Sequence, residues 1–180
     1  LSAHREENID TDRNFLQLFT AVNAMAEKYD MPILYSCHPR SRKRLEATGF
    51  RLDSRVIAHE PLGFHDYNCL QMNAFAVVSD SGTLPEESSF FLSAGKPFPA
   101  ISIRTSTERP EALDAGCFIL AGIDAESLLQ AVKMADGMQR TACFGTPVED
   151  YTAENVSMKV ARIIQSYTGI VNKMVWRKDG

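Results

Sequence analysis

Short apolar runs alternate with helical patterns along this chain, and no other feature of the sequence restricts the fold as strongly. The expected strands span residues 31–36, 55–58, 75–78, 99–103 and 117–120. The expected helices span residues 8–29, 39–48, 66–73, 84–93, 110–115, 125–138 and 153–167. Strands that are this short and uniformly apolar are buried on both faces, as in a parallel sheet covered by helices. The alternation therefore predicts a doubly wound, Rossmann-like α/β fold.

The bulk composition is that of one globular domain, which we expect to span residues 1–180. A chain of 180 residues with 44% hydrophobic content can bury a sizeable core. Its net charge of −4 gives no electrostatic support for a nucleic-acid partner. A short basic cluster at residues 40–44 is expected to lie on a solvated helix face. We therefore expect no nucleic-acid partner.

The four cysteines lack the CxxC spacing of zinc sites and redox motifs, so we expect neither a metal site nor a disulfide framework. The sequence shows no signal peptide, and no apolar run approaches the ~20 residues that a membrane helix needs. These features predict a cytoplasmic protein without a membrane partner. The chain begins at Leu1, and residues 2–8 have the pattern of a strand end that enters a helix. We therefore expect a fragment of a longer protein.

Polar residues follow the third expected strand, at the sheet edge where doubly wound folds bind their ligands. Gly82 allows a ligand to approach the backbone, and Ser81 can cap the following helix or donate to a phosphate oxygen. A capping box is the alternative, with Thr83 as the N-cap residue and Glu86 reaching back to it. Either arrangement leaves Glu87 unassigned. Because a carboxylate repels phosphate, we expect Glu87 to accept hydrogen bonds from ribose hydroxyls.

A second polar turn follows the next strand. Pro110 suits the first turn of a helix, and the guanidinium groups of Arg104 and Arg109 can neutralise a diphosphate. The alternative is that Arg109 only forms an ion pair with Glu108 or Glu111. Two such turns on neighbouring strands, one with carboxylates and one with arginine, predict a nucleotide-diphosphate site.

Six short segments carry a resemblance to a known family. They are HREEN at 4–8, HPR at 38–40, EPL at 60–62, SDSG with the following EE at 79–87, GKP at 95–97 and TERPE at 107–111. In this order and spacing they resemble the C-terminal domain of the non-hydrolysing UDP-N-acetylglucosamine 2-epimerases. The resemblance implies one half of a GT-B-like two-domain enzyme that binds UDP-sugar between its halves and requires no cofactor. It also implies that the N-terminal domain, which this chain lacks, carries the acid and base of the reaction.

The resemblance further implies roles for individual residues near the sugar and the base. His4 looks like the active-site histidine of the family, held near the diphosphate and the reacting sugar. Tyr67 falls where an aromatic ring contacts the uracil. Leu62 is a departure, because some members of the family have glutamine at this position.

Five more residues match positions that hold the nucleotide in the family. Ser81 and the backbone of Gly82 and Thr83 match the phosphate site, Glu87 the ribose site and Arg109 the site of diphosphate neutralisation. Thr83 replaces a glycine that is common in the family. The resemblance therefore predicts a UDP site along the turns after the third and fourth expected strands.

The same resemblance implies the reaction. It predicts the UDP-binding half of a UDP-N-acetylhexosamine 2-epimerase, which eliminates UDP across C1–C2 and adds it back on the opposite face. The product would serve capsule or O-antigen polysaccharide synthesis, the full-length form would be a homodimer, and the isolated fragment would be inactive. Residues 79–89 and 103–116 look more like the branch that acts on 6-deoxy sugars such as UDP-2-acetamido-2,6-dideoxy-L-talose.

Two other functions share these predictions in part. The donor-binding domain of a GT-B glycosyltransferase would have the same fold and bind UDP, although the HREEN and TERPE segments favour the epimerase. A non-catalytic nucleotide-sensing module would bind the same ligand without turnover. Among the other histidines, His38 either lines the cleft or serves helix entry, whereas His59 and His65 are expected in surface or packing roles.

Overall fold

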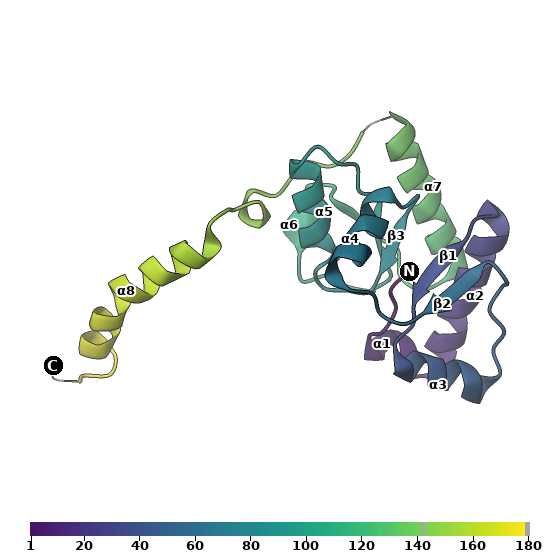
Figure 1. Ribbon diagram of the computed structural model, residues 1–180, viewed down its shortest axis with the longest axis horizontal. Helices are drawn as coiled ribbons and strands as arrows, with labels where there is room; N and C mark the ends of the chain where they lie inside the picture. The colour runs from purple at the N-terminus through teal and green to yellow at the C-terminus, as the bar shows by residue number, and fades with distance from the viewer. Residues whose placement is uncertain (142, 179–180) are drawn as a thin grey trace. The chain divides into compact units, whose positions relative to one another are not determined.

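The computed structural model describes residues 1–141 and 143–178. Its internal contacts divide the chain into two compact units, Leu1–Val148 and Glu149–Gly180 (Figure 1). The single domain expected over residues 1–180 thus comprises two units, which are described separately below. The first unit contains the sheet and all of the predicted site residues.

The first unit is built on a parallel sheet. Its strands are β1 (Ile33–Ser36), β2 (Val56–His59), β3 (Val77–Ser79), β4 (Ala100–Ser102) and β5 (Phe118–Leu120). Parallel pairing joins β1 to β2, β3 to β4 and β4 to β5. Ser2 forms parallel bridges to both Ser36 and Ser79, so the segment around Ser2 is a short central strand between β1 and β3.

Counting the Ser2 segment as the first strand gives the spatial order 3-2-1-4-5-6, which is the order of a Rossmann sheet. The predicted doubly wound fold is therefore confirmed. The strand order reverses between the Ser2 segment and β3. This reversal is the topological switch point, where folds of this type bind their ligands.

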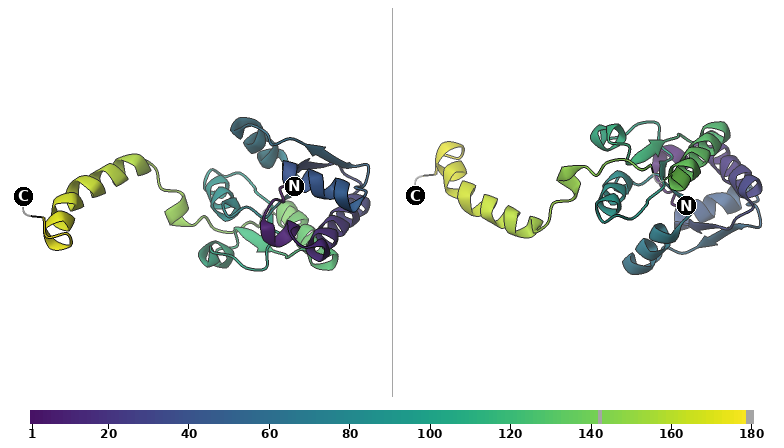
Figure 2. Two further views of the ribbon diagram at one scale, coloured as in Figure 1. Left: turned by 90° about the horizontal axis from the view of Figure 1, so that it is seen from below. Right: turned by 90° about the horizontal axis from the view of Figure 1, so that it is seen from above.

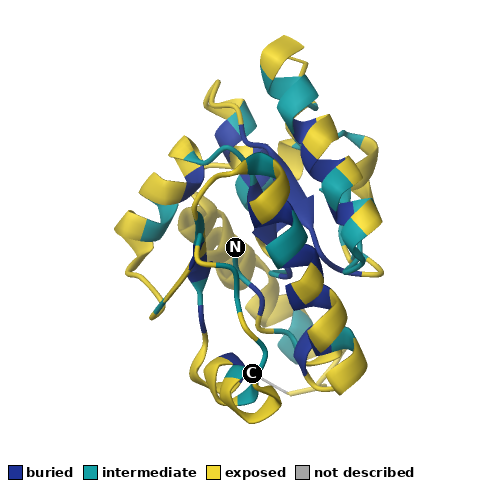
Figure 3. Cartoon of the chain, turned by 90° about the vertical axis from the view of Figure 1, so that its right-hand side faces the viewer, coloured by how far each residue is buried: buried dark blue, intermediate teal, exposed yellow. Residues whose placement is uncertain are grey.

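Helices cover both faces of the sheet (Figure 2). They are α1 (Glu6–Ile9), α2 (Asp12–Tyr29), α3 (Pro39–Thr48), α4 (Phe64–Asn73), α5 (Leu84–Ser93), α6 (Pro110–Asp114) and α7 (Ala125–Thr141). The long helices α2 and α7 pack against each other, and α5 packs against α6, β4 and β5. The buried residues gather on the strands and on the inner faces of these helices (Figure 3).

The core between the sheet and α2 is aromatic. Phe15, Phe19 and Tyr35 are fully buried, with ring centroids 4.6 Å apart for Phe15–Phe19 and 5.4 Å apart for Phe19–Tyr35. Burying a side chain of this size stabilises the fold by about 1.5–3 kcal/mol. Such packing fixes α2 and β1 and, through them, the strand ends that carry the candidate site.

Local capping sets the helix boundaries. The single helix expected at residues 8–29 is two helices, because the Thr11 side chain accepts a hydrogen bond from Asn14 N at 3.1 Å and so starts α2 afresh. The helix expected from Pro39 is confirmed. It ends at Gly49, whose positive φ of 64° is the left-handed conformation that glycine adopts without strain.

The second unit consists of a short 3₁₀ turn, Glu149–Tyr151, and α8 (Val156–Met174). No residue of α8 is buried, although the helix carries apolar side chains such as Ile163 and Ile164. The helix begins and ends later than the 153–167 span expected from the sequence. Within the described part of the chain, no helix has the length and apolar character needed to cross a membrane.

Candidate functional site

The candidate site lies at the switch point, where the Ser2 segment and β3 end side by side. Ser2 N donates to Val78 O at 2.9 Å, and Asp80 N donates to Ser2 O at 3.1 Å. His4 and Arg5 therefore leave the sheet next to the turn that begins at Asp80. Two segments separated by more than seventy residues in the sequence thus meet at one edge of the sheet.

Asp80 ties these two segments together. Its side chain is fully buried, and Oδ2 accepts hydrogen bonds from His4 N at 2.9 Å, Arg5 N at 2.8 Å and Asn8 Nδ2 at 3.1 Å. Asn8 Nδ2 also donates to Ile103 O at 3.0 Å. Asp80 is not among the site residues predicted from the sequence. Its position, directly after a buried strand and opposite a helix start, is the signal that could have identified it.

His4 lies beside this carboxylate. Its Nδ1 is 3.3 Å from Asp80 Oδ1 and 3.5 Å from Ser2 Oγ. The side chain is 47% exposed, whereas that of Asp80 is inaccessible. The predicted active-site histidine is therefore at the switch point, with one edge of its ring against protein and the rest open to a ligand.

In the turn after β3, the Arg5 guanidinium lies against the main chain of Gly82. Ser81 N donates to Ser79 Oγ at 3.0 Å, and Ser81 Oγ accepts from Thr83 N at 3.3 Å. A Cβ atom added to Gly82 would lie 2.8 Å from Arg5 Nη2, so the Arg5 guanidinium sits directly against Gly82. That guanidinium forms no direct hydrogen bond with the described residues, and its positive charge helps to lower the pKa of Glu108. Arg5 is not among the site residues predicted from the sequence, although it lies in the HREEN segment at 4–8.

The two carboxylates of α5 have different partners. Glu87 accepts from Thr83 Oγ1 at 2.6 Å through Oε1 and from Gln71 Nε2 at 2.8 Å through Oε2. Glu86 instead forms an ion pair with Arg109, at 2.7 Å from Nη2. The Thr83 side chain caps no helix N–H group, so the capping-box alternative for Thr83 and Glu86 is wrong. The reason is that Thr83 Oγ1 donates to Glu87 and the Glu86 carboxylate pairs with Arg109.

The two arginines near α6 are held differently. Arg104 is buried and binds Glu108 at 2.8 Å and Glu7 at 3.1 Å, so two carboxylates already neutralise it. The hydrogen bonds from Arg104 lower the pKa of Glu108 to about 2, and those carboxylates raise the pKa of Arg104. Arg109 is partly exposed and its Nη1 also donates to Glu108 O at 3.1 Å. Arg109 is therefore the more accessible of the two guanidinium groups.

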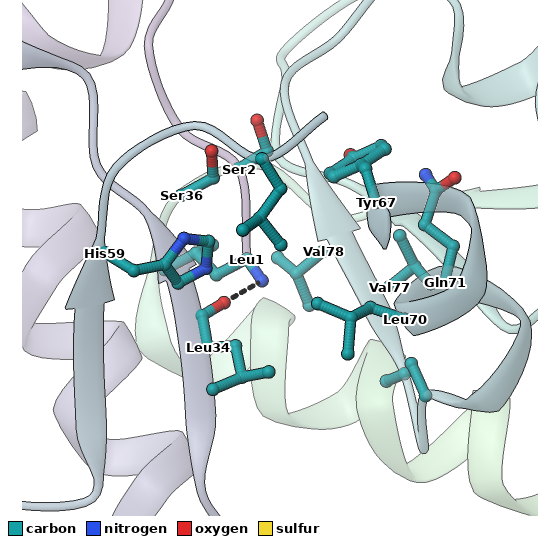
Figure 4. A pocket seen from close by; sticks show the side chains of 13 residues that line it. Leu1, Ser2, Leu34, Ser36, His59, Tyr67, Leu70, Gln71, Val77 and Val78 are labelled. Carbon is teal, nitrogen blue, oxygen red and sulfur yellow. Dashed lines mark hydrogen bonds between the residues drawn. The ribbon is translucent and has the colours of Figure 1, made fainter. Parts of the chain in front are cut away.

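Tyr67 lies on α4. It lines a small cavity of about 60 Å³ together with Ser2, His59 and Gln71, among other residues (Figure 4). Burial raises the pKa of Tyr67, and the negative charge of Glu87 adds to this effect. The hydrogen bond between Gln71 and Glu87 connects this cavity to the turn at Thr83.

The other histidines have local partners. His38 is the N-cap of α3, and its Nδ1 accepts a hydrogen bond from Arg40 N at 3.3 Å, which is the helix-entry role. His59 Nδ1 is 2.7 Å from Glu60 O, and the ring contributes to the wall of the Tyr67 cavity. His65 is exposed and packs edge-on against Phe64.

The predicted site residues form one connected region. His4 is bound to Asp80, the residue before Ser81 and Gly82, and Thr83 bonds Glu87 on α5. Gln71, which shares α4 with Tyr67, bonds Glu87, and Arg109 pairs with the neighbouring Glu86. A doubly wound sheet with polar turns gathered at its switch point defines a Rossmann-like domain of the type that binds nucleotides.

A comparison with protein families shows which family of nucleotide-binding domains this chain belongs to. The family described as UDP-N-acetylglucosamine 2-epimerase matches residues 1–165, and this chain belongs to that family. A UDP-N-acetylglucosamine 2-epimerase from Methanococcus maripaludis is 35% identical over 137 residues, which cover 74% of this chain and 36% of the relative. The matched part of the chain therefore spans well under half the length of the relative.

Solved structures agree with this assignment. The UDP-N-acetylglucosamine 2-epimerase of Rickettsia bellii has a TM-score of 0.83 and 37% identity, covering 98% of this chain and 46% of that protein. The Methanocaldococcus jannaschii enzyme, solved with UDP-GlcNAc and UDP, has a TM-score of 0.78 and 28% identity, covering 92% of this chain and 44% of that protein. These similarities confirm the expected Rossmann-like half of a GT-B-type fold.

Proposed function

We propose that this chain is the UDP-binding half of a UDP-N-acetylhexosamine 2-epimerase. The observation that carries the proposal is the meeting of His4 and Arg5 with the Ser81–Gly82 turn at the switch point. The family match and the relative solved with UDP-GlcNAc and UDP support the same ligand. The substrate is UDP-GlcNAc or UDP-ManNAc, or a 6-deoxy analogue.

The diphosphate is assigned to the turn after β3. Ser81, Thr83 and the backbone at Gly82 supply hydrogen-bond donors, and Gly82 lets a phosphate come close to the main chain. Arg5 lies against this turn, and its charge interacts only at longer range with Glu108, so a diphosphate can take its guanidinium without breaking a direct hydrogen bond to the described residues. Arg109 contributes a second guanidinium, which must share its hydrogen bonds with Glu86.

The nucleoside is assigned to the region between α4 and α5. Glu87 accepts two hydrogen bonds from neutral donors, Thr83 and Gln71, and ribose hydroxyls can replace such donors. Tyr67 forms part of the cavity wall, at a position suited to contact with the uracil. The nucleotide then runs from Tyr67 past Glu87 to the Gly82 turn.

The proposed reaction breaks the C1–O bond to UDP as a base removes the C2 proton, which gives a 2-acetamidoglycal. UDP then adds back at C1 while C2 receives a proton on the opposite face. His4 acts near the departing diphosphate, and the acid and base belong to a preceding domain of a longer polypeptide. We further assign the full-length enzyme to the cytoplasm, as a homodimer that supplies capsule or O-antigen precursors.

The proposal is tested with the longer polypeptide that contains this chain. Incubation with UDP-GlcNAc in D₂O without an acceptor should produce UDP-ManNAc and place deuterium at C2 in both epimers. The 180-residue chain alone should bind UDP weakly by calorimetry and turn over no UDP-sugar. UDP-2-acetamido-2,6-dideoxy-L-talose, assayed in parallel, separates the two substrate branches.

Two other results of this experiment would contradict the proposal. Sugar transfer that requires an added acceptor, without deuterium at C2, would identify a glycosyltransferase. UDP binding without turnover of any UDP-N-acetylhexosamine by the longer polypeptide would identify a nucleotide-sensing module.

A further inference from the structure

The buried carboxylate of Asp80 has one oxygen that the surrounding protein leaves unused. Oδ2 accepts three N–H donors, but Oδ1 is buried and accepts no hydrogen bond from the described residues. Buried carboxylate oxygens strongly favour a donor, because the lost contact with water must be replaced. The unused oxygen therefore indicates a donor that lies close to Oδ1 without forming a complete hydrogen bond in this structure.

The ring of His4 is positioned to be that partner. Nδ1 lies 3.3 Å from Oδ1, within ion-pair distance, and a small rotation of the ring would complete a hydrogen bond. The backbone of His4 is already fixed to the same carboxylate through its N–H group. Asn8, which bonds both Asp80 Oδ2 and Ile103 O, holds the carboxylate itself in place.

Ser2 is the competing partner of the imidazole. Its hydroxyl lies 3.5 Å from Nδ1, at the outer limit for a hydrogen bond. A serine hydroxyl that donated to Nδ1 would require the proton on Nε2, whereas Asp80 requires it on Nδ1. The two arrangements therefore predict opposite tautomers of neutral His4.

We propose that Asp80 is a positioning residue, which accepts the Nδ1 proton of His4 and so directs Nε2 toward the bound diphosphate. The role of Asp80 in catalysis rests on the function proposed above, but the Asp80–His4 pair does not. A carboxylate behind an imidazole fixes the ring and stabilises its protonated form, as in the Asp–His pair of serine proteases. Protonated Nε2 can then donate to a phosphate oxygen as charge develops on the leaving group.

The tautomer of His4 is measured directly in the 180-residue chain by nitrogen-15 NMR of the imidazole groups. At about pH 9, well above the usual histidine pKa of about 6.5, the neutral rings report which nitrogen carries the proton. Two other histidines serve as internal references. His38 Nδ1 accepts from Arg40 N and so has its proton on Nε2, whereas His59 Nδ1 faces the Glu60 carbonyl and so carries the proton.

We expect His4 to match His59, with the proton on Nδ1. Asp80→Asn keeps an oxygen for the His4 and Arg5 N–H groups but can present an amide N–H to Nδ1, so the tautomer should switch to the His38 type. Ser2→Ala is the matched control and should leave the tautomer unchanged. A His4 signal of the His38 type in the unsubstituted chain would overturn the proposal, even if Asp80→Asn failed to fold. So would a switch caused by Ser2→Ala but not by Asp80→Asn.

The catalytic consequence is tested in the longer polypeptide. Asp80→Asn should lower kcat by roughly 10²–10⁴, the range for acid–base and related help from a positioned side chain, while the Kd for UDP changes less than threefold. Equal losses in kcat and UDP affinity would indicate a purely structural role. If the unsubstituted polypeptide epimerises no UDP-sugar, the proposed function fails, but the tautomer result still decides whether the Asp80–His4 pair exists.

Discussion

Arg109 reaches from the start of α6 to Glu86 in the first turn of α5, with Nε and Nη2 at 2.8 and 2.7 Å from the same carboxylate oxygen. The pair is more than a third exposed on both sides. It therefore contributes little to stability in water, and a ligand with greater negative charge can displace the carboxylate. The ion pair holds Arg109 near the turn that we assign to the diphosphate.

Arg109→Ala should weaken UDP binding by about 1.5–3 kcal/mol, the range for hydrogen bonds to charged groups. Lysine should restore only part of this loss, because it lacks the planar fork that binds two phosphate oxygens together. Isothermal titration calorimetry on the 180-residue chain measures the effect. The control is Arg140→Ala, which removes a comparable ion pair with Asp136 on α7. An unchanged UDP affinity in Arg109→Ala would show that Arg109 only links α5 to α6.

Gly82→Ala should reduce UDP affinity without unfolding the chain. The added Cβ would lie 2.8 Å from Arg5 Nη2, so the guanidinium must move away from the turn. Stability should change little, because the displaced atom is the far end of a flexible side chain. Gly137→Ala on α7 is the control, since its Cβ would meet no atom within 4 Å. That change should stabilise the helix by about 0.5–1 kcal/mol and leave UDP binding intact.

The sequence was sufficient to predict the doubly wound sheet, because its short strands are apolar on both faces. It also placed the helix at residues 84–93 and the one that begins at Pro39, where proline and glycine mark the ends. It did not predict the break before Thr11, since the apolar spacing continues through both helices. At Thr11 the side-chain cap starts a new helix, although the apolar spacing is continuous.

The polar side of the site was harder to predict. Sequence spacing places residues at strand ends, but it does not show which acid meets which base across the sheet. Arg104 and Arg109 are only five positions apart, yet one is buried between Glu7 and Glu108 and the other is exposed beside Glu86. The link between Asp80 and His4 depends on the order of strands in space, which no local pattern records.

The Arg104–Glu108 pair should make folding of the first unit sensitive to acid. Arg104 lowers the pKa of Glu108 from its ordinary 4.5 to about 2, so the unfolded state binds this proton more readily than the folded state. The contribution to the free energy of unfolding is therefore complete above pH 4.5 and is lost as the pH falls toward 2. Glu108→Gln should flatten the decline in stability across this interval.

Urea unfolding at a series of pH values tests this expectation. Trp176, the single tryptophan, lies outside the first unit, so unfolding is followed by circular dichroism or amide exchange. Asp53, whose pKa Arg55 lowers to about 2, adds a second decline that should persist in Glu108→Gln. The control is Glu27→Gln, an exposed residue of α2 without an ion pair among the described residues. A pH profile of Glu108→Gln that matched the unsubstituted chain would contradict the expectation.

Glu87 offers a test of where the ribose binds, because a deoxynucleotide removes one of its expected partners. Thr83 and Gln71 donate to the two oxygens of Glu87, so the carboxylate is held ready for neutral donors. Glu87→Ala should weaken UDP binding by about 1.5–3 kcal/mol, the range for hydrogen bonds to a charged group. It should weaken 2′-deoxy-UDP less, since that ligand already lacks one hydroxyl. Calorimetry with both ligands on both proteins gives the coupling energy. Equal losses for the two ligands would mean that Glu87 does not bind the 2′-hydroxyl and acts only as a support for Thr83 and Gln71.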